Sequence, residues 1–206
     1  MHWIWSMVST FTAQRVSVRR HGIGKSLCLT FDDGPHPEYT PALLDVLAQH
    51  QVKATFFLLG NNVVAHPELV ERLVREGHVI GNHSMTHLNP RQIGWRRQLT
   101  EVDQADEVLA RFDQRKRHLY RPPRGCATVT LIINAVLRQP MVLWTFDSLD
   151  GKLGEHDLVS RLKSYDARGG DILLFHDDTK VTIEALRQAI PHWLAKGFAF
   201  KTVTAS

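Results

Sequence analysis

Segments typical of β-strands and of α-helices alternate along almost the whole of this 206-residue chain. Short runs rich in apolar, β-branched and aromatic residues predict strands at residues 27–32, 53–59, 78–82, 119–121, 141–146, 171–175 and 198–203. Helical patterns are predicted between them, at residues 41–50, 67–76, 95–112, 129–137, 158–163 and 182–195. Such alternation indicates βα units and a parallel sheet, which either closes as a barrel or stays open with helices on both faces.

Two of the predicted helices have recognisable ends. Thr40 precedes Pro41, which predicts a helix that is capped by Thr40 and begins at Pro41. Gly77 directly follows the second helical pattern and predicts its end. The chain contains no internal repeat, low-complexity stretch or linker. We therefore predict a single α/β domain over residues 1–206, with residues 1–25 as an N-terminal extension of unassigned role.

The composition is that of an ordinary globular protein, with 43% hydrophobic and 22% charged residues. Lys and Arg exceed Asp and Glu by 25 to 21, a formal net charge of +4, which mildly favours anionic partners. No nucleic-acid-binding motif accompanies this charge, so we expect no nucleic-acid partner. No apolar run reaches the length of a transmembrane helix, and no signal indicates a particular oligomeric state.

The N-terminal residues and the cysteines carry less specific signals. Residues 1–13 are rich in Trp and other apolar residues, but Ser and Thr interrupt them and Lys and Arg are absent, which is atypical of a signal peptide. They either contact a membrane surface or pack against the barrel, so cytoplasmic and cell-envelope locations both stay open. Cys28 and Cys126 form no CxxC pair, and we expect two buried thiols.

The first motif with chemical content is an apolar run that ends in two adjacent carboxylates. Residues 27–31 lead directly into Asp32 and Asp33, and Gly34 and Pro35 follow. Two acids are costly to bury without partners, and at a strand end their side chains can diverge. One of them would then bind a metal ion while the other acts as a base. The alternative interpretation is a surface turn.

The second motif is a pair of histidines, His83 and His87, just after a predicted short strand. In a helical turn, positions i and i+4 lie on one face, so both imidazoles would reach the same ion. Two histidines and one carboxylate with an open position form the arrangement typical of a catalytic zinc. The chain contains 12 histidines, so two unrelated surface residues are the alternative.

Polar residues also follow the other predicted strands. Arg121 stands before two prolines, and a buried arginine there requires a carboxylate, for which Asp32 is the natural candidate. Asp150 and His176 each lie close after an apolar strand. Trp144 lies within such a strand and is expected in the core. Because the carboxyl ends of parallel strands meet at one edge of a sheet or barrel, the polar residues are expected at one rim.

Five motifs in this order resemble the NodB-type polysaccharide deacetylases of carbohydrate esterase family 4. The family pattern is TFDDGP, then H-S/T-x-x-H, R-x-P, D-x-x-D-W and L-x-L-x-H. The resemblance extends over residues 27–203. It implies a single-domain distorted (β/α)7 barrel, in agreement with the predicted strands.

The resemblance also implies roles for the residues of the first three motifs. Asp33, His83 and His87 match the metal ligands of the family. Asp32 matches the catalytic base, and Arg121 matches the arginine that holds this base in place. The implied cofactor is one divalent cation, zinc by preference, with cobalt, nickel and manganese as alternatives.

For the rest of the site, the resemblance implies an acid and a substrate pocket. His176 matches the catalytic acid and Asp150 its supporting carboxylate. Leu174 matches the residue that lines the acetyl methyl pocket, and the backbone N–H of Arg124 matches an oxyanion donor. Two departures concern the groove: Arg124 stands where the family often has Tyr, and Gly151 stands where it has Trp.

Together these matches imply a metal-dependent hydrolase that removes acetyl groups from N-acetylated amino sugars in poly- or oligosaccharides, such as chitin oligomers or peptidoglycan glycan. The implied partner is therefore an acetylated glycan. One alternative is an O-acetyl esterase, or a deacylase of another acylated or lipid-linked sugar. A second alternative is a non-catalytic carbohydrate-binding protein, which the loss of the groove Trp would favour.

Overall fold

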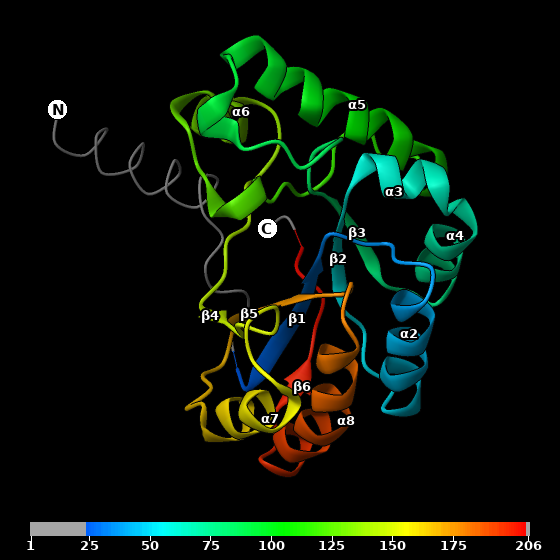
Figure 1. Ribbon diagram of the computed structural model, residues 1–206, viewed down its shortest axis with the longest axis vertical. Coiled ribbons are helices and arrows are strands. Elements are labelled where there is room, and N and C mark those ends of the chain that lie inside the picture. Colours follow the sequence, from blue (N-terminus) through cyan, green and yellow to red (C-terminus); the bar gives the residue numbers. More distant parts are fainter. Residues whose placement is uncertain (1–23, 205–206) are drawn as a thin grey trace, which may run out of the picture.

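A computed structural model describes residues 24–204 and places parallel strands at the centre of the molecule, with helices around them (Figure 1). The N-terminal extension expected at residues 1–25 therefore lies almost wholly outside the described residues. For the same reason, a single domain over the whole chain stays a prediction. Among the described residues, no helix is long and apolar enough to cross a bilayer.

The described strands are all paired in parallel, as the alternation of strands and helices predicts. Their order is β3-β2-β1-β5-β4, and β6 also pairs with β1. Their bounds are Ser26–Asp32 (β1), Thr55–Leu58 (β2), Val79–Asn82 (β3), Phe146–Asp147 (β4), Asp171–His176 (β5) and Ala199–Phe200 (β6).

Single bridges extend this sheet into a ring. Tyr120 pairs with Asn82 at the end of β3 and with Met141 on its other side. The chain then runs from Met141 into β4, where the N–H of Thr145 donates to the carbonyl of Ile172 in β5. The pairings therefore return to β5, as expected for a barrel. Two of the predicted strands, 119–121 and 141–146, are reduced to single bridges and a two-residue strand.

The ring is uneven where β6 meets β1. β1 pairs with β6 only through Ser26 and Leu27, and with β2 only from Thr30 onward. Two strands thus share one edge of β1, and the N–H of Val203 donates to the Oγ1 of Thr55 between them (2.9 Å). The predicted last strand, 198–203, is accordingly short, because β2 occupies the rest of that edge.

The helices cover the outside of the strands, with α5 and α6 at one end of the view and α7 and α8 at the other (Figure 1). The short helix α3 was not expected from the sequence, because its pattern is too brief to show periodicity. The helix bounds are Tyr39–Gln49 (α2), Gly60–Ala65 (α3), Pro67–Arg75 (α4), Trp95–Asp113 (α5), Val129–Leu137 (α6), Glu155–Ser164 (α7) and Lys180–Ala195 (α8).

The predicted cap of the first helix is wrong. Thr40 lies inside α2, and the side chain of Glu38 at the N-cap makes no capping bond. The hydroxyl of Thr40 accepts from the N–H of His36 and donates to the Oδ2 of Asp177, each at 2.7 Å. Asp177 is buried at the end of β5 and needs a donor, which overrides the local preference of Thr40.

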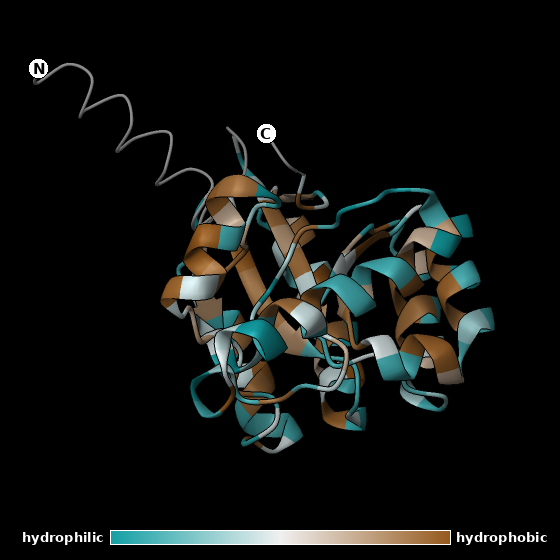
Figure 2. Cartoon of the chain, turned by 90° about the horizontal axis from the view of Figure 1, so that it is seen from above, coloured by the Kyte–Doolittle hydropathy of each residue, from teal (hydrophilic) through white to brown (hydrophobic). Residues whose placement is uncertain are grey.

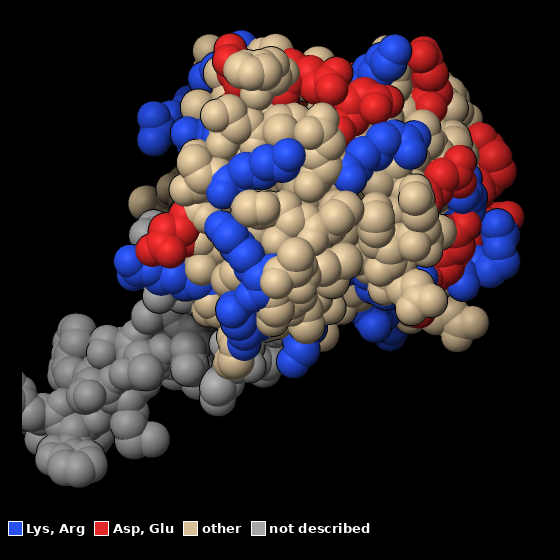
Figure 3. Space-filling model, turned by 90° about the horizontal axis from the view of Figure 1, so that it is seen from below, with Lys and Arg blue, Asp and Glu red and all other residues tan. Residues whose placement is uncertain are grey.

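The core lies against the faces of β1, which is buried along its whole length. Phe31 of β1 stacks on Phe56 of β2, with ring centroids 4.9 Å apart. Brown apolar residues accordingly dominate the central strands in Figure 2. Cys28 and Cys126 are two buried free thiols, as predicted, and burial raises the pKa of Cys28 to about 12. On the underside, both basic and acidic side chains are visible (Figure 3).

Candidate active site

A pocket of about 220 Å³ opens at the carboxyl ends of the strands. It contains seven of the nine predicted site residues, and the other two, Arg121 and Asp150, are buried next to it. The lining residues come from β1, β4, β5 and the loops next to the strands; they are Asp32, Asp33, His83, His87, Arg124, Gly125, Trp144, Asp147, Leu174 and His176.

The predicted metal ligands form one cluster in this pocket. The Oδ1 of Asp33 lies 3.4 Å from the Nε2 of His83 and 3.5 Å from the Nε2 of His87. One ligand atom from each residue lies within 4.8 Å of the others, the only such group of three or more potential ligands among residues 24–204. The Oδ1 of Asp33 is buried and has no hydrogen-bond partner, so the donor set fits a divalent cation.

The two histidines are set up to offer their Nε2 atoms. The Nδ1 of His83 lies 2.8 Å from the carbonyl oxygen of Arg121, which holds the proton on Nδ1 and leaves Nε2 free. Burial lowers the pKa of His87, although the charge of Asp33 opposes this effect. A neutral imidazole is the form that binds a metal ion, so both environments suit a ligand.

The helical turn predicted for these histidines is wrong. Ser84 and His87 have left-handed backbone, with φ of 73° and 58°, and residues 83–87 are not helical but bend at residues 85–86. The N–H of Ser84 donates to the side chain of Asn82, and the N–H of His87 donates to the Oγ of Ser84. These local bonds supply the partners that a helix would otherwise provide, so the rings converge without helical spacing.

The adjacent carboxylates diverge as predicted, because the backbone changes direction between them. Asp32 is the last residue of β1, whereas Asp33 has a left-handed φ of 75°. This conformation costs an ordinary residue about 1 kcal/mol or more. The side chain of Asn62 at the start of α3 donates to the carbonyl of Asp33 at 2.7 Å and helps to hold it.

Asp32 is paired with Arg121, as the sequence predicts. The Nη1 of Arg121 donates to the Oδ1 of Asp32 at 2.7 Å and lies 2.9 Å from the Oγ1 of Thr30. The guanidinium is fully buried and lies over the ring of Phe57, at 4.2 Å from its centroid. Burial lowers the pKa of Arg121, and Asp32 opposes this effect. The pair thus fixes one oxygen of Asp32 while the other faces the pocket side, 3.7 Å from His83.

A second pair lies across the pocket. The Nδ1 of His176 is 2.8 Å from the Oδ1 of Asp150, and the backbone N–H of His176 donates to the Oδ2. The hydroxyl of Thr182, in the first turn of α8, donates to the same Oδ2 at 2.6 Å. Burial opposes the charged form of His176, but the hydrogen bond and charge of Asp150 outweigh it and raise the pKa to about 9. His176 is therefore an imidazolium at neutral pH.

Leu174 and Arg124 lie where a substrate would contact the pocket. Leu174 lines it from β5 and is almost fully buried. Arg124 lies in the short 3-10 turn Pro123–Gly125 with a left-handed φ of 59°, and its side chain is exposed. Arg124 and Gly125 both line the pocket, and the role of the Arg124 N–H as a donor stays a prediction.

Trp144 was predicted in the core, and this prediction is confirmed only in part: the side chain is half-buried and packs against a buried cluster that includes Phe57 and Ile172, but it also lines the pocket. Its ring lines the pocket and lies against Gly125, where an added Cβ would come within 2.6 Å of the ring. Asp147 also lines the pocket, and the sequence analysis did not assign it a role. In the sequence, the glycine at position 125 is the feature that indicates a close approach of a side chain to the backbone there. At Gly151, by contrast, the space around an added Cβ is empty.

Comparisons with known proteins agree with this geometry. Residues 19–139 match the family model described as polysaccharide deacetylase. A peptidoglycan-N-acetylglucosamine deacetylase of Bacillus cereus is 35% identical over 86% of this chain, and the match covers 66% of that protein. A chitooligosaccharide deacetylase of Sinorhizobium fredii is 33% identical over 91% of this chain and 94% of its own length.

A solved structure gives the same result for the fold. The crystal structure of a peptidoglycan N-acetylglucosamine deacetylase, in complex with an N-hydroxybenzamide compound, superposes with a TM-score of 0.87 at 31% identity. The match covers 97% of this chain and 94% of that one.

Proposed function

The chain belongs to the polysaccharide deacetylase family, and we propose that it hydrolyses the acetamide groups of N-acetylated amino sugars in a glycan. The names of the two relatives support an acetylated glycan as the substrate class. The observation that carries the proposal is the arrangement of the pocket, in which two partnered acid–base pairs flank a cluster of two histidines and a carboxylate.

Asp33, His83 and His87 would hold one divalent cation. A cluster with two imidazoles and one carboxylate suits zinc, and cobalt, nickel and manganese accept the same donors. When bound, such an ion polarises a carbonyl group and lowers the pKa of water.

Asp32 would act as the general base. One of its oxygens is held by Arg121, so the other is free to take a proton from water beside the scissile carbonyl. The short bond to Arg121 keeps the carboxylate in one orientation, which a base requires. The backbone N–H of Arg124 would donate to the oxygen on which negative charge develops.

His176 would act as the general acid. An amine is a poor leaving group unless it is protonated, and the imidazolium of His176 supplies that proton. Asp150 holds the ring through Nδ1, so Nε2 is left to face the sugar nitrogen. Leu174 would contact the acetyl methyl group. The products are acetate and a free amino sugar.

The two alternatives are not favoured. An O-acetyl ester has an alcohol leaving group, which needs less protonation than an amine. Hydrolysis of such an ester would therefore gain little from the raised pKa of His176. A non-catalytic binding protein would not need the residues proposed as base, acid and metal ligands, which all line one pocket.

The experiment is acetate release from N-acetylchito-oligosaccharides and from peptidoglycan fragments. Protein freed of metal and then reloaded with zinc or cobalt should release acetate only after reloading. The double variant His83→Ala, His87→Ala should lose both stoichiometric metal and activity. His156→Ala, at an exposed position on α7, is the matched control and should retain both.

Two results would contradict the proposal. Acetate release of equal rate in metal-free protein would remove the metal from the reaction. Absence of release from every acetamide, with release from O-acetylated sugars, would instead establish the esterase alternative.

A further inference from the structure

The outer surface of α5 and α6 carries an unusual share of exposed apolar side chains. Among residues 24–204, seven large hydrophobic side chains are exposed, and four of them lie on these two helices: Trp95, Val129, Ile133 and Leu137. We call these four residues the α5–α6 face. Contiguous apolar surface on a globular protein commonly marks an interaction site.

The face extends along α6 and over the start of α5. Residues 129, 133 and 137 follow each other at intervals of four, so they form one stripe along α6. Between this stripe and Trp95 at the start of α5 lies a groove of about 400 Å³. Leu99, Ile133 and Leu137 line it together with Trp95.

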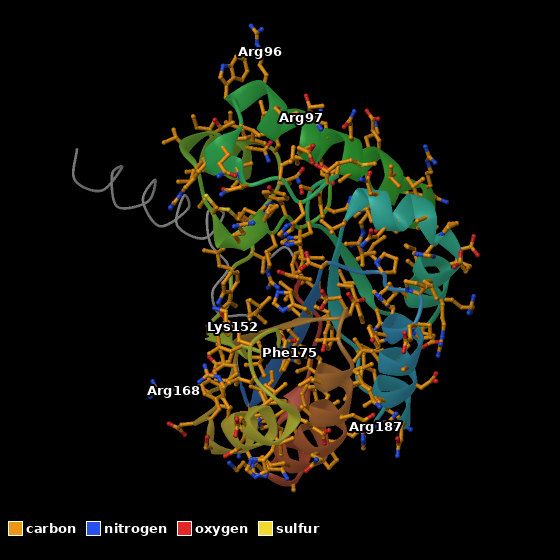
Figure 4. The ribbon with its side chains drawn as sticks, in the orientation of Figure 1. Arg96, Arg97, Lys152, Arg168, Phe175 and Arg187 are labelled. Atoms are coloured by element: carbon orange, nitrogen blue, oxygen red, sulfur yellow. The ribbon has the colours of Figure 1, made fainter. Side chains whose placement is uncertain are left out.

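The charges at the amino end of α5, next to this face, are positive, and Arg96 among them has no acidic partner in the described part of the chain. Arg138, which lines the groove, pairs with Asp103 at 2.7 Å. The first turn of α5 contains Arg96 and Arg97 but no acid, and Gly94 at the N-cap provides no side-chain cap. Arg97 pairs with Glu101, whereas the guanidinium of Arg96 lies over the Trp95 ring at 5.0 Å. Arg96 extends away from the helix in Figure 4. Arg91 lies in the short 3-10 helix Pro90–Gln92, which precedes α5 in the chain. No ion pair involves Arg91 or Arg96 within the described part of the chain.

This arrangement is unfavourable for the isolated helix. The amino end of a helix carries a partial positive charge, so arginines there destabilise it unless an anion is close. Stability alone would place Asp or Glu in this turn. At the amino end of α5, positive charge without a nearby acid is combined with exposed Trp, Ile and Leu side chains. This combination instead suits a partner that is negatively charged at its surface and apolar beneath it.

We propose that the α5–α6 face binds the surface of a bilayer that contains anionic lipids. Trp95 and the α6 stripe would enter the boundary between headgroups and acyl chains, where Trp is favoured. Arg91 and Arg96 would meet lipid phosphates. None of these residues lines the catalytic pocket, so the proposal does not depend on the proposed deacetylase activity.

Other occupants fit the charges less well. In a two-fold dimer through this face, the positive ends of two α5 helices would be brought together. Residues 1–23 are also apolar, but they contain three arginines and no acid, so their charge does not complement Arg91 and Arg96.

The experiment is co-sedimentation of the full chain with phosphatidylcholine vesicles, with and without phosphatidylglycerol. We expect binding that requires phosphatidylglycerol. The triple variant Trp95→Ser, Ile133→Ser, Leu137→Ser should weaken it by about tenfold or more, because full burial of even one large apolar side chain contributes at least about a factor of ten. Arg91→Gln with Arg96→Gln should weaken it by about 25-fold in total, at about fivefold per arginine.

The matched control is Val64→Ser with Leu194→Ser, which removes two exposed apolar side chains from α3 and α8. This variant should bind like the parent protein, and melting curves should show that every variant is folded. Acetate release from soluble oligosaccharides should also be unchanged.

Three results would overturn the proposal. The first is the absence of binding to any phosphatidylglycerol vesicle. The second is undiminished binding of the triple variant, above all if Trp3→Ser with Trp5→Ser abolishes it, which would assign the contact to residues 1–23. The third is a dimer in solution that the triple variant dissociates, which would assign the face to a second copy of the chain.

Discussion

The two ion pairs next to the pocket have opposite charge arrangements. On one side, the cation Arg121 is fully buried and supports the carboxylate of Asp32. On the other side, the carboxylate of Asp150 is buried and supports the cation of His176, whose side chain is 30% exposed. In both pairs, the residue with the fixed supporting charge lies inside the protein and its partner faces the pocket.

The difference between the pairs lies in what each can exchange with a substrate. Arg121 does not lose its proton in a working enzyme, so Asp32 has a permanent positive neighbour. His176 titrates, and its pKa depends on Asp150. The first pair is therefore suited to hold a base at every working pH, whereas the second is suited to deliver a proton only below a limiting pH. Four substitutions test this division.

The largest effect is expected from Asp32→Asn. An amide cannot accept the proton from water, so turnover should fall by roughly 10²–10⁴, the usual contribution of general acid–base catalysis. Zinc content should stay at that of the parent protein, because Asp33 and the two histidines are unchanged. Turnover and metal content are measured on the same preparation, with Asp45→Asn on exposed α2 as the control. Normal turnover would remove Asp32 as the base.

The next effect is on folding, through Arg121→Leu. Loss of one partner leaves the buried carboxylate of Asp32 unpaired, which costs about 3–5 kcal/mol in unfolding free energy. The double variant Arg121→Leu, Asp32→Asn should recover part of this loss, because no unpaired charge remains. Urea unfolding of both variants measures it. Equal stability of the single and double variants would mean that the ion pair is not what Arg121 contributes.

A smaller effect is expected on the pH profile, through Asp150→Asn. In the parent protein, activity should fall as pH rises through about 9, because the acid must be protonated. Without the charge of Asp150, this alkaline limit should move down toward the ordinary histidine value of about 6.5. The rate against pH with soluble oligosaccharide measures the shift. An unchanged limit would show that another group sets it.

The same pair also affects stability in a defined pH range. The pKa of His176 is raised above its value in an unfolded chain, so the stabilisation is present below about pH 6.5 and is lost as pH rises through about 9. Asp150→Asn should therefore lower the melting temperature more at pH 6 than at pH 10.

The smallest effect is expected from Thr182→Val, which removes one hydrogen bond to Asp150 without changing its charge. The pKa of Asp150 is lowered because the bonds from His176 and Thr182 outweigh the opposing effect of burial. The variant should move the alkaline limit in the same direction as Asp150→Asn but by less, and cost about 1–3 kcal/mol in stability. Thr182→Ser should restore both. Loss of stability without any shift would make Thr182 purely structural.

The sequence predicted the strand and helix order well, because apolar periodicity is a local property. It also predicted which residues gather at the strand ends, since parallel strands align their carboxyl ends. It failed where distant groups compete with local preference. Thr40 donates a hydrogen bond to the buried Asp177 instead of capping a helix. His83 and His87 converge without a helix, in a segment held by the bond from the N–H of His87 to Ser84. Trp144 lines the pocket because Gly125 leaves room for its ring.

The sequence by itself determined the chemical groups and their order: the adjacent acids at the end of β1, the two histidines after β3, Arg121, Asp150 and His176. Only the tertiary structure decided which of these groups touch. The bond between Arg121 and Asp32 joins residues 89 positions apart, and the bond between His176 and Asp150 spans 26. Such contacts depend on closure of the strand ring, and that closure is a property of the packed chain, in which every buried charge must find its partner.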